Sequence, residues 1–333
     1  MGRKLRHILI FLLIILKEPN MPKGDDICAP SSRGRCPNLG LTKIPKNLPT
    51  SIYQLDLKGN QITSIQSGVF SNLPKLTSLL LNSNNITSIQ ANIFSHLTKL
   101  ENLDLNSNSI NTIQLGTFSN LPNLSCLNLT SNQISCIPVG AFTNLPKLKS
   151  LYLNSNKITS IHAGVFSNLP QLRRLYLNAN QISSIRVGVF SNLRQLQRLY
   201  LNANQISSIH VGVFSNLRQL RRLYLNANQI SGIQVGTFQN LPKLLSLNLN
   251  SNKITSIQVG AFSNMPQINT LELASNQISS VHVGAFSNLP MLSRLNLASN
   301  QISSIQVGTF SILANLWTLL LNSNNITSIE LRC

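Results

Sequence analysis

Residues 172–195 read LRRLYLNANQISSIRVGVFSNLRQ, and the pattern of this stretch recurs every 24 residues along most of the chain. Each copy closes the frame L-x-x-L-x-L-x-x-N with an asparagine. Twelve asparagines keep this spacing without a slip: Asn60, Asn84, Asn108, Asn132, Asn156, Asn180, Asn204, Asn228, Asn252, Asn276, Asn300 and Asn324. Self-similarity at a fixed period of this size predicts a solenoid built from stacked repeats.

The frame itself is the leucine-rich-repeat signature, whose period is about 20–29 residues. Its L-x-L step predicts a short strand with alternating side chains, so that Leu175 and Leu177 point inward and Tyr176 points outward. Strands of successive repeats should then pair side by side. We therefore expect a right-handed α/β solenoid, a horseshoe with a concave parallel β-sheet inside and irregular or short helical turns outside.

Two further columns of the repeat are expected to hold this fold together. The repeat asparagine can pair buried backbone groups of adjacent turns, which would cost roughly 1–3 kcal/mol each if left unpaired. Phenylalanine fills a second column and should form a stacked spine, because neighbouring repeats bury what one repeat cannot. Its members are Phe70, Phe94, Phe118, Phe142, Phe166, Phe190, Phe214, Phe238, Phe262, Phe286 and Phe310.

Residues 1–17 have the composition of a secretory signal peptide. Arg3, Lys4 and Arg6 precede the apolar run 8–16, which is shorter than the roughly 20 apolar residues that span a bilayer. No small-x-small cleavage site follows, so a signal anchor or a misread start is the alternative. Four sequons are candidate glycosylation sites and fit a secreted or extracellular-surface protein. They are Asn85, Asn123, Asn128 and Asn325.

Cysteines stand in two pairs and at the last position. The stretch that follows Cys36 resembles the second half of the cysteine-rich N-terminal cap of extracellular leucine-rich-repeat proteins, which implies a cap at residues 25–52 with a Cys28–Cys36 disulfide. Cys126 falls on an outward strand position and Cys136 lies past the turn. They are expected to be free thiols, because the Cα atoms of a disulfide lie about 5.5–6 Å apart.

The repeats are expected over residues 53–316, followed by an incomplete last repeat over 317–333 that ends at the unpaired Cys333. No cysteine-rich C-terminal cap follows Asn324. Because solenoids need capped ends to stay soluble, we expect a fragment or an end that another surface covers. No transmembrane helix or lipid-anchor signal is seen, so direct membrane insertion is not indicated.

The outward strand positions of the central repeats carry the residue types that are enriched at binding hot spots, Tyr and Arg. Arginine offers a planar fork of donors for carboxylate or phosphate. We predict a ligand-binding surface here, and recent tandem copying of YLNANQIS is the alternative explanation. The residues are Tyr152, Tyr176, Tyr200 and Tyr224, then Arg174, Arg198 and Arg222 with Arg173 and Arg221, and Asn178, Asn202 and Asn226.

Charge points to anionic ligands. The chain has a formal net charge of +19, and no Asp or Glu stands between Leu105 and Leu271. A positive field of this breadth recruits anions and weakens with salt. Microbial surface glycans and lipid-linked phosphates, sulfated glycans and acidic proteins qualify as partners. Nucleic acid is the weakest candidate because no nucleic-acid motif is present, and a merely solubilising charge is the alternative.

Catalysis has little support in the sequence. His162, His210 and His282 share one repeat column but stand two and three repeats apart. That separation is about 10 Å or more at sheet spacing, which is too far for joint metal ligation. No nucleophile–base pair, paired carboxylates or glycine-rich phosphate loop stands out. We therefore expect no enzyme, no cofactor and no metal site.

Residues 28–330 resemble the extracellular 24-residue class of leucine-rich repeats, and within it the variable lymphocyte receptors of jawless vertebrates. NKITSI at 156–161, GVFSNL at 164–169 and LYLNSN at 151–156 carry this resemblance. It implies immune recognition of a microbial surface ligand or a protein antigen on the concave strand face. Toll-like receptor ectodomains and matrix leucine-rich proteins share the repeat. The alternative function is therefore an adhesion or extracellular-matrix protein that binds a host protein or sulfated glycan.

Overall fold

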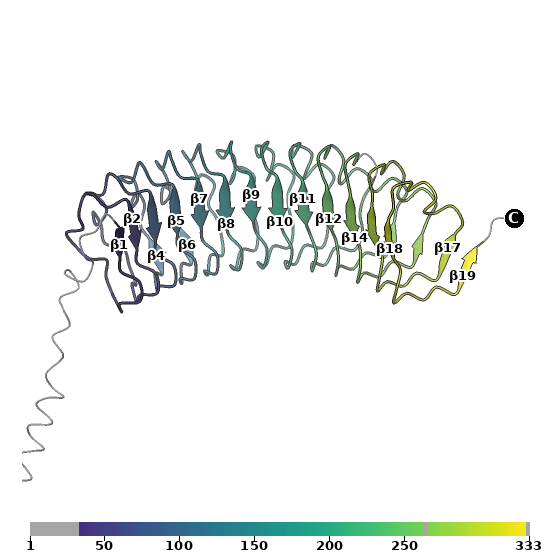
Figure 1. Ribbon diagram of the computed structural model, residues 1–333, viewed down its shortest axis with the longest axis horizontal. Coiled ribbons are helices and arrows are strands. Elements are labelled where there is room, and N and C mark those ends of the chain that lie inside the picture. The colour runs from purple at the N-terminus through teal and green to yellow at the C-terminus, as the bar shows by residue number, and fades with distance from the viewer. Residues whose placement is uncertain (1–32, 263–264, 331–333) are drawn as a thin grey trace, which may run out of the picture.

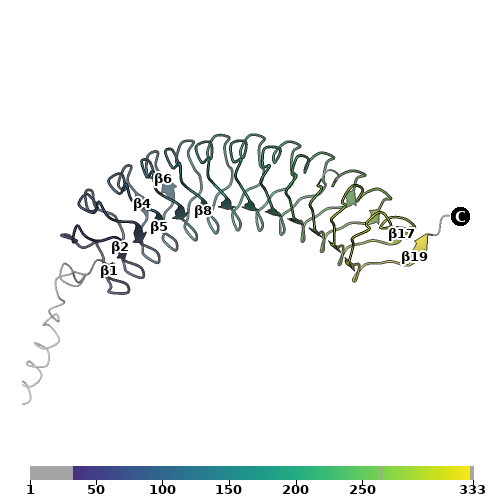
Figure 2. The same cartoon turned by 45° about the horizontal axis from the view of Figure 1, so that its top comes forward.

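The chain coils into an arch whose strands lie on the inner side. The computed structural model describes residues 33–262 and 265–330 (Figure 1). Thirteen short strands pair in parallel into one sheet, and the connecting loops run along the outer side of the arch (Figure 2). The predicted horseshoe with a concave parallel sheet is thus confirmed. The described residues contain no helix, so irregular turns close each repeat.

The main sheet consists of three-residue strands in chain order. They are β1 (Arg33–Arg35), β2 (Gln54–Asp56), β3 (Ser78–Leu80), β5 (Asn102–Asp104), β7 (Cys126–Asn128), β8 (Ser150–Tyr152), β9 (Arg174–Tyr176), β10 (Arg198–Tyr200), β11 (Arg222–Tyr224), β12 (Ser246–Asn248), β14 (Thr270–Glu272), β16 (Arg294–Asn296) and β18 (Thr318–Leu320). Three small sheets pair β4 (Ser88–Ile89) with β6 (Thr112–Ile113), β13 (Ser256–Ile257) with β15 (Ser280–Val281), and β17 (Ser304–Gln306) with β19 (Ser328–Glu330).

The register does not change from one repeat to the next. Leu175, Leu199 and Leu223 are direct partners on β9, β10 and β11, and all three are buried. Because side chains alternate along a strand, burial of the middle leucine turns the first and third residues toward the inner face of the arch. Each repeat therefore presents the same positions, side by side, along the concave surface.

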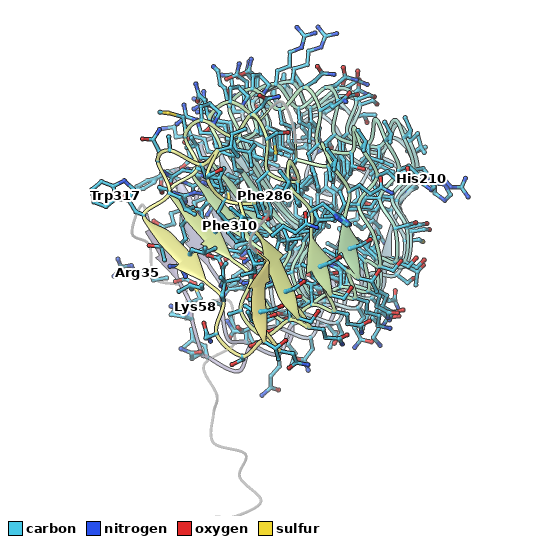
Figure 3. The ribbon with its side chains drawn as sticks, turned by 90° about the vertical axis from the view of Figure 1, so that its right-hand side faces the viewer. Arg35, Lys58, His210, Phe286, Phe310 and Trp317 are labelled. Atoms are coloured by element: carbon cyan, nitrogen blue, oxygen red, sulfur yellow. The ribbon has the colours of Figure 1, made fainter. Side chains whose placement is uncertain are left out.

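The phenylalanine spine is confirmed. Consecutive rings from Phe70 to Phe310 stack with centroids 5.9–6.4 Å apart. Phe286 and Phe310 lie inside the coil at the end that faces the viewer in Figure 3. The spine and the inward leucines form one continuous hydrophobic core along the solenoid.

The structural role of the asparagine column is also confirmed. Asn204 accepts a hydrogen bond from the Ile182 N–H at 3.0 Å, and its amide donates to the carbonyls of Leu177 and Leu201 at 3.0 Å. Two of these three partners belong to the preceding repeat, so the asparagine ties one turn of the coil to the next. The same set of bonds recurs at Asn324.

The sheet extends one strand beyond the repeats at the N-terminal end. Strand β1, inside the predicted cap, pairs in parallel with β2. We did not predict this strand, because its sequence RGR lacks the repeat frame. Next to it Cys36 is fully buried, and its carbonyl accepts a 2.8 Å hydrogen bond from Asn60.

Several predictions concern residues outside the described range. They are the signal segment 1–17, Cys28 and Cys333, so the signal peptide and the Cys28–Cys36 disulfide stay predictions. Cys126 and Cys136 are free thiols, as expected. Within residues 33–262 and 265–330, no helix has the length and apolar character needed to cross a membrane.

Candidate functional site on the concave face

Strands β8 to β11 place the predicted binding residues together on the inner face of the arch. The tyrosines occupy the third position of each strand, and the arginines occupy the first position of β9, β10 and β11. Arg173 and Arg221 come one residue earlier and are exposed. Asn178, Asn202 and Asn226 follow the tyrosines by two residues and are half-buried. The geometry of all twelve positions is as predicted, and their role in binding stays a prediction.

The four tyrosines Tyr152, Tyr176, Tyr200 and Tyr224 form a stacked row, the tyrosine ladder. Their ring centroids are 4.4, 4.4 and 4.7 Å apart, and neighbouring planes deviate by 5–8°. In-register strands about 4.8 Å apart bring identical side chains to this separation. The inner ring faces therefore cover one another, and the ladder presents ring edges and hydroxyl groups to solvent.

Burial of the tyrosine ladder affects its titration. Burial is the largest cause that raises the pKa of Tyr176, and the neighbouring Tyr152 adds to it through charge and hydrogen bonding. Burial likewise raises the pKa of Tyr200, with Tyr176 as the next cause. Both hydroxyls therefore stay protonated at neutral pH and are available as hydrogen-bond donors.

Arg174, Arg198 and Arg222, the arginine ladder, are direct partners across β9, β10 and β11. Like charges that face each other across neighbouring strands repel. In the described part of the chain the one salt bridge joins Arg294 to Glu272, so no carboxylate neutralises the arginine ladder. The ladder therefore holds three aligned and uncompensated positive charges.

Asn178, Asn202 and Asn226, the asparagine ladder, line the other side of the tyrosines. Among the described residues their side chains form no hydrogen bonds, whereas Asn154 accepts one from the Thr130 hydroxyl at 2.9 Å. The tyrosine and asparagine ladders line one shallow groove of about 570 Å³, together with Asn154, Thr130 and Asn248. The arginine ladder runs along the opposite edge of the tyrosines.

Beyond the tyrosine ladder, the same columns carry a closed polar cluster. Glu272 occupies the tyrosine position on β14 and accepts hydrogen bonds from Arg294 at 2.8 Å and from Asn296 at 2.6 Å. Asn250 donates a third bond at 3.4 Å. Burial alone would raise the pKa of Glu272, but these hydrogen bonds and the Arg294 charge outweigh it and lower that pKa. The repeat spacing alone did not predict these partners of Glu272.

Other reactive side chains do not converge on this surface. Burial, followed by the charge of Asp104, raises the pKa of the Cys126 thiol on β7, which disfavours a reactive thiolate. His162, His210 and His282 are exposed. His210 and Trp317 project from opposite sides of the coil (Figure 3). No group of three His, Cys, Asp or Glu side chains within the described ranges is placed to hold a metal ion.

A larger hollow of about 1090 Å³ lies away from the concave ladders, between the turns that follow each phenylalanine. Asn216, Asn240 and Pro242 line part of it. Equivalent residues line another hollow four repeats earlier, including Asn120 and Asn144. Because the same lining recurs, we attribute these hollows to repeat geometry and place the candidate site on the concave face.

The leucine-rich-repeat family matches this chain over most of its length. Six overlapping matches cover residues 50–106, 74–134, 122–182, 170–230, 218–278 and 266–326. The chain therefore belongs to the leucine-rich-repeat family.

Known relatives include extracellular matrix, bacterial and receptor proteins. Human decorin is 49% identical over 47 residues, which make up 14% of this chain and 13% of decorin. An internalin from Listeria monocytogenes superposes with a TM-score of 0.66 and 32% identity over 84% of this chain and 80% of the internalin. The receptor TLR13, in a complex with single-stranded RNA, gives a TM-score of 0.72 and 28% identity over 83% of this chain and 44% of the receptor. The fold is thus shared with receptors and matrix proteins.

Proposed function

We propose that this chain is a secreted or surface-tethered recognition protein that binds anionic ligands on the concave face of its central repeats. Microbial surface glycans and lipids are the ligands that we favour, which would give the protein an immune role like that of the variable lymphocyte receptors. The proposal assigns the chain to binding rather than to catalysis.

The arginine ladder is the observation that carries this proposal. Three arginines repeat at strand spacing without a carboxylate partner in the described chain, while Arg294, in the same column, is paired with Glu272 at 2.8 Å. An anion that docks on the ladder would relieve the repulsion among its charges and accept charge-assisted hydrogen bonds. The tyrosine ladder beside it offers rigid contact area with little conformational entropy to lose.

A second function is favoured by a separate observation. The similarity to decorin over 47 residues supports an adhesion or extracellular-matrix protein that binds a host protein or sulfated glycan. The same ladders would serve it, because sulfate groups and acidic side chains are also anions. The two functions differ in the source of the ligand rather than in the binding surface.

A binding panel tests both functions. Immobilised lipopolysaccharide and teichoic acid would represent the bacterial envelope, and heparan sulfate and collagen would represent the host matrix, with RNA as a further arm. The triple variant Arg174→Gln, Arg198→Gln and Arg222→Gln should bind its anionic ligand at least about tenfold more weakly, which corresponds to about 1.4 kcal/mol. Its binding should also depend less on salt.

The matched control is Arg294→Gln. It removes a charge from the same column, but Glu272 already neutralises that charge in the parent. Binding by this control should therefore stay within about twofold of the parent. Unchanged affinity of the triple variant at physiological salt would exclude the arginine ladder as the binding site.

A further inference from the structure

We infer that the ligand is a linear anionic polysaccharide that lies along the axis of the solenoid, across strands β8 to β11. This inference rests on the proposed function and specifies the ligand class and its direction. The ligand's charged edge contacts the arginine ladder, and its hydroxyl-bearing edge contacts the asparagine ladder. The tyrosine ladder forms the floor between them.

The direction follows from the register of the strands. Each ladder runs perpendicular to the strands, because equivalent residues are partners across β9, β10 and β11. The tyrosine ladder spans four strands, which enclose three intervals of about 4.8 Å, and so extends for about 14 Å, whereas the arginine and asparagine ladders span three strands and about 10 Å. A single anionic group engages one or two arginines. A linear chain with charges along one edge engages all three, and its affinity increases with each added contact.

The tyrosine stacking disfavours nucleic acid. Proteins that bind single strands stack bases on exposed aromatic faces. Insertion of a base between two rings requires a ring separation of about 7 Å, twice the 3.4 Å base rise. The rings here lie 4.4–4.7 Å apart and nearly parallel, so their inner faces are already covered. Ring edges and hydroxyls remain, and these contact a ligand through hydrogen bonds and positive edge potential.

The asparagine ladder supplies the match to hydroxyl groups. An amide offers two donors and one acceptor oxygen, so it pairs with a sugar hydroxyl that both donates and accepts. The three amides are half-buried and form no side-chain hydrogen bonds within the described chain, in contrast to Asn250, which donates to Glu272 and accepts from the Ala274 N–H. The amide N–H groups can also donate to an anion, but only a hydroxyl-bearing edge uses the amide oxygens as well, so this row favours a glycan over a bare polyanion.

The experiment compares oligomers of graded length by calorimetry with the full chain. Alginate oligomers provide a carboxylated microbial glycan, heparin oligomers a sulfated animal glycan, and polyphosphate of equal charge a polyanion without hydroxyls. Affinity for the preferred glycan should rise with length until about 14 Å is covered and then level off. It should exceed the affinity for polyphosphate by about tenfold. Which glycan is preferred identifies the source.

Two variants separate this inference from the proposed function. Asn178→Ala, Asn202→Ala and Asn226→Ala together should weaken glycan binding about tenfold and weaken polyphosphate binding much less, while Asn250→Ala should change neither. Equal binding of glycan and polyphosphate, with no effect of the asparagine triple variant, would overturn the inference and leave the arginine-based function standing. Tighter binding of poly(U) than of either glycan would also overturn it. Unchanged binding by the arginine triple variant would overturn both this inference and the proposed function.

Discussion

The central repeats and the repeats that follow them present the same columns on the concave face but fill them in opposite ways. On β9 to β11 the arginines face one another and the asparagine amides have no partners in the described chain. In the later repeats, Glu272 on β14 bonds to Arg294 and Asn296 on β16 and to Asn250, which follows β12, in one cluster. The same repeat scaffold therefore carries an open surface, whose arginine and asparagine side chains lack partners in the described chain, next to a closed surface, whose polar side chains bond to one another. The closed cluster forms around a single carboxylate, that of Glu272, and the open surface is the one suited to a ligand.

The largest expected effect tests whether both regions share the same scaffold. Asn204→Leu and Asn276→Leu remove equivalent side chains from the two regions, and each parent side chain forms three buried hydrogen bonds of 3.0–3.1 Å. Each variant should lose about 3–5 kcal/mol of unfolding free energy, because buried backbone groups are left unpaired. Urea denaturation measures the loss. If either variant melts at the parental temperature, the column is not structural in that region.

A smaller effect tests the closed cluster. Glu272→Gln should cost about 1 kcal/mol at pH 7, since the exchange removes a charge-assisted partner from a half-exposed arginine. Because the folded-state pKa of Glu272 is lowered, its stabilisation is present above the unfolded value of about 4.3. That stabilisation is lost as the pH falls through the lower folded value. The difference between parent and variant, measured by denaturation, should therefore shrink toward zero in acid.

The same stability measurement on the open surface should give a change of the opposite sign. Arg198→Gln reduces repulsion within the arginine ladder and should raise stability by a few tenths of a kcal/mol at low salt. A gain of the same size from Glu272→Gln, or a pH-independent loss, would contradict the division into an open and a closed region.

A further small effect is expected at a site that touches neither surface. Thr237 is 2% exposed, and its hydroxyl has no hydrogen-bond partner among the described residues. Valine occupies the same repeat position at Val189 and Val213 and is buried there. Thr237→Val should therefore raise the unfolding free energy by roughly 0.5–1 kcal/mol and leave ligand binding unchanged. Thr309→Val is the control, since that hydroxyl donates to the Gln306 carbonyl at 2.7 Å, and it should not stabilise.

The fold and the columns of the site were predictable because both depend only on spacing. A 24-residue period and the alternation of strand residues suffice to place Leu175 inside, Arg174 and Tyr176 outside, and Asn180 in the turn. The stacking of Phe190 follows from the same period. No information beyond the order of the residues is needed for any of these positions.

The remaining features depend on conformations that spacing does not specify. The mutual stacking of Tyr176 and Tyr200 requires both side chains to adopt the same rotamer. The bonds of Glu272 reach into neighbouring repeats and depend on side-chain conformers. Ala203 adopts a φ of 54°, where other repeats mostly use serine in the same left-handed conformation. Strand β1 has no repeat frame, so periodicity could not reveal it.

The phenylalanine spine has a consequence for the shape of the binding surface. In the central repeats the spine rings are 6.1–6.4 Å apart, whereas the tyrosine rings on the inner face are 4.4–4.7 Å apart. Each repeat is therefore a wedge, and the radius of the arch depends on the bulk that fills its outer half. Smaller residues along the spine would flatten the arch and spread the tyrosines, although no concave residue had changed. The buried phenylalanines, which lie away from the concave face, thus determine the spacing of the side chains that would contact a ligand.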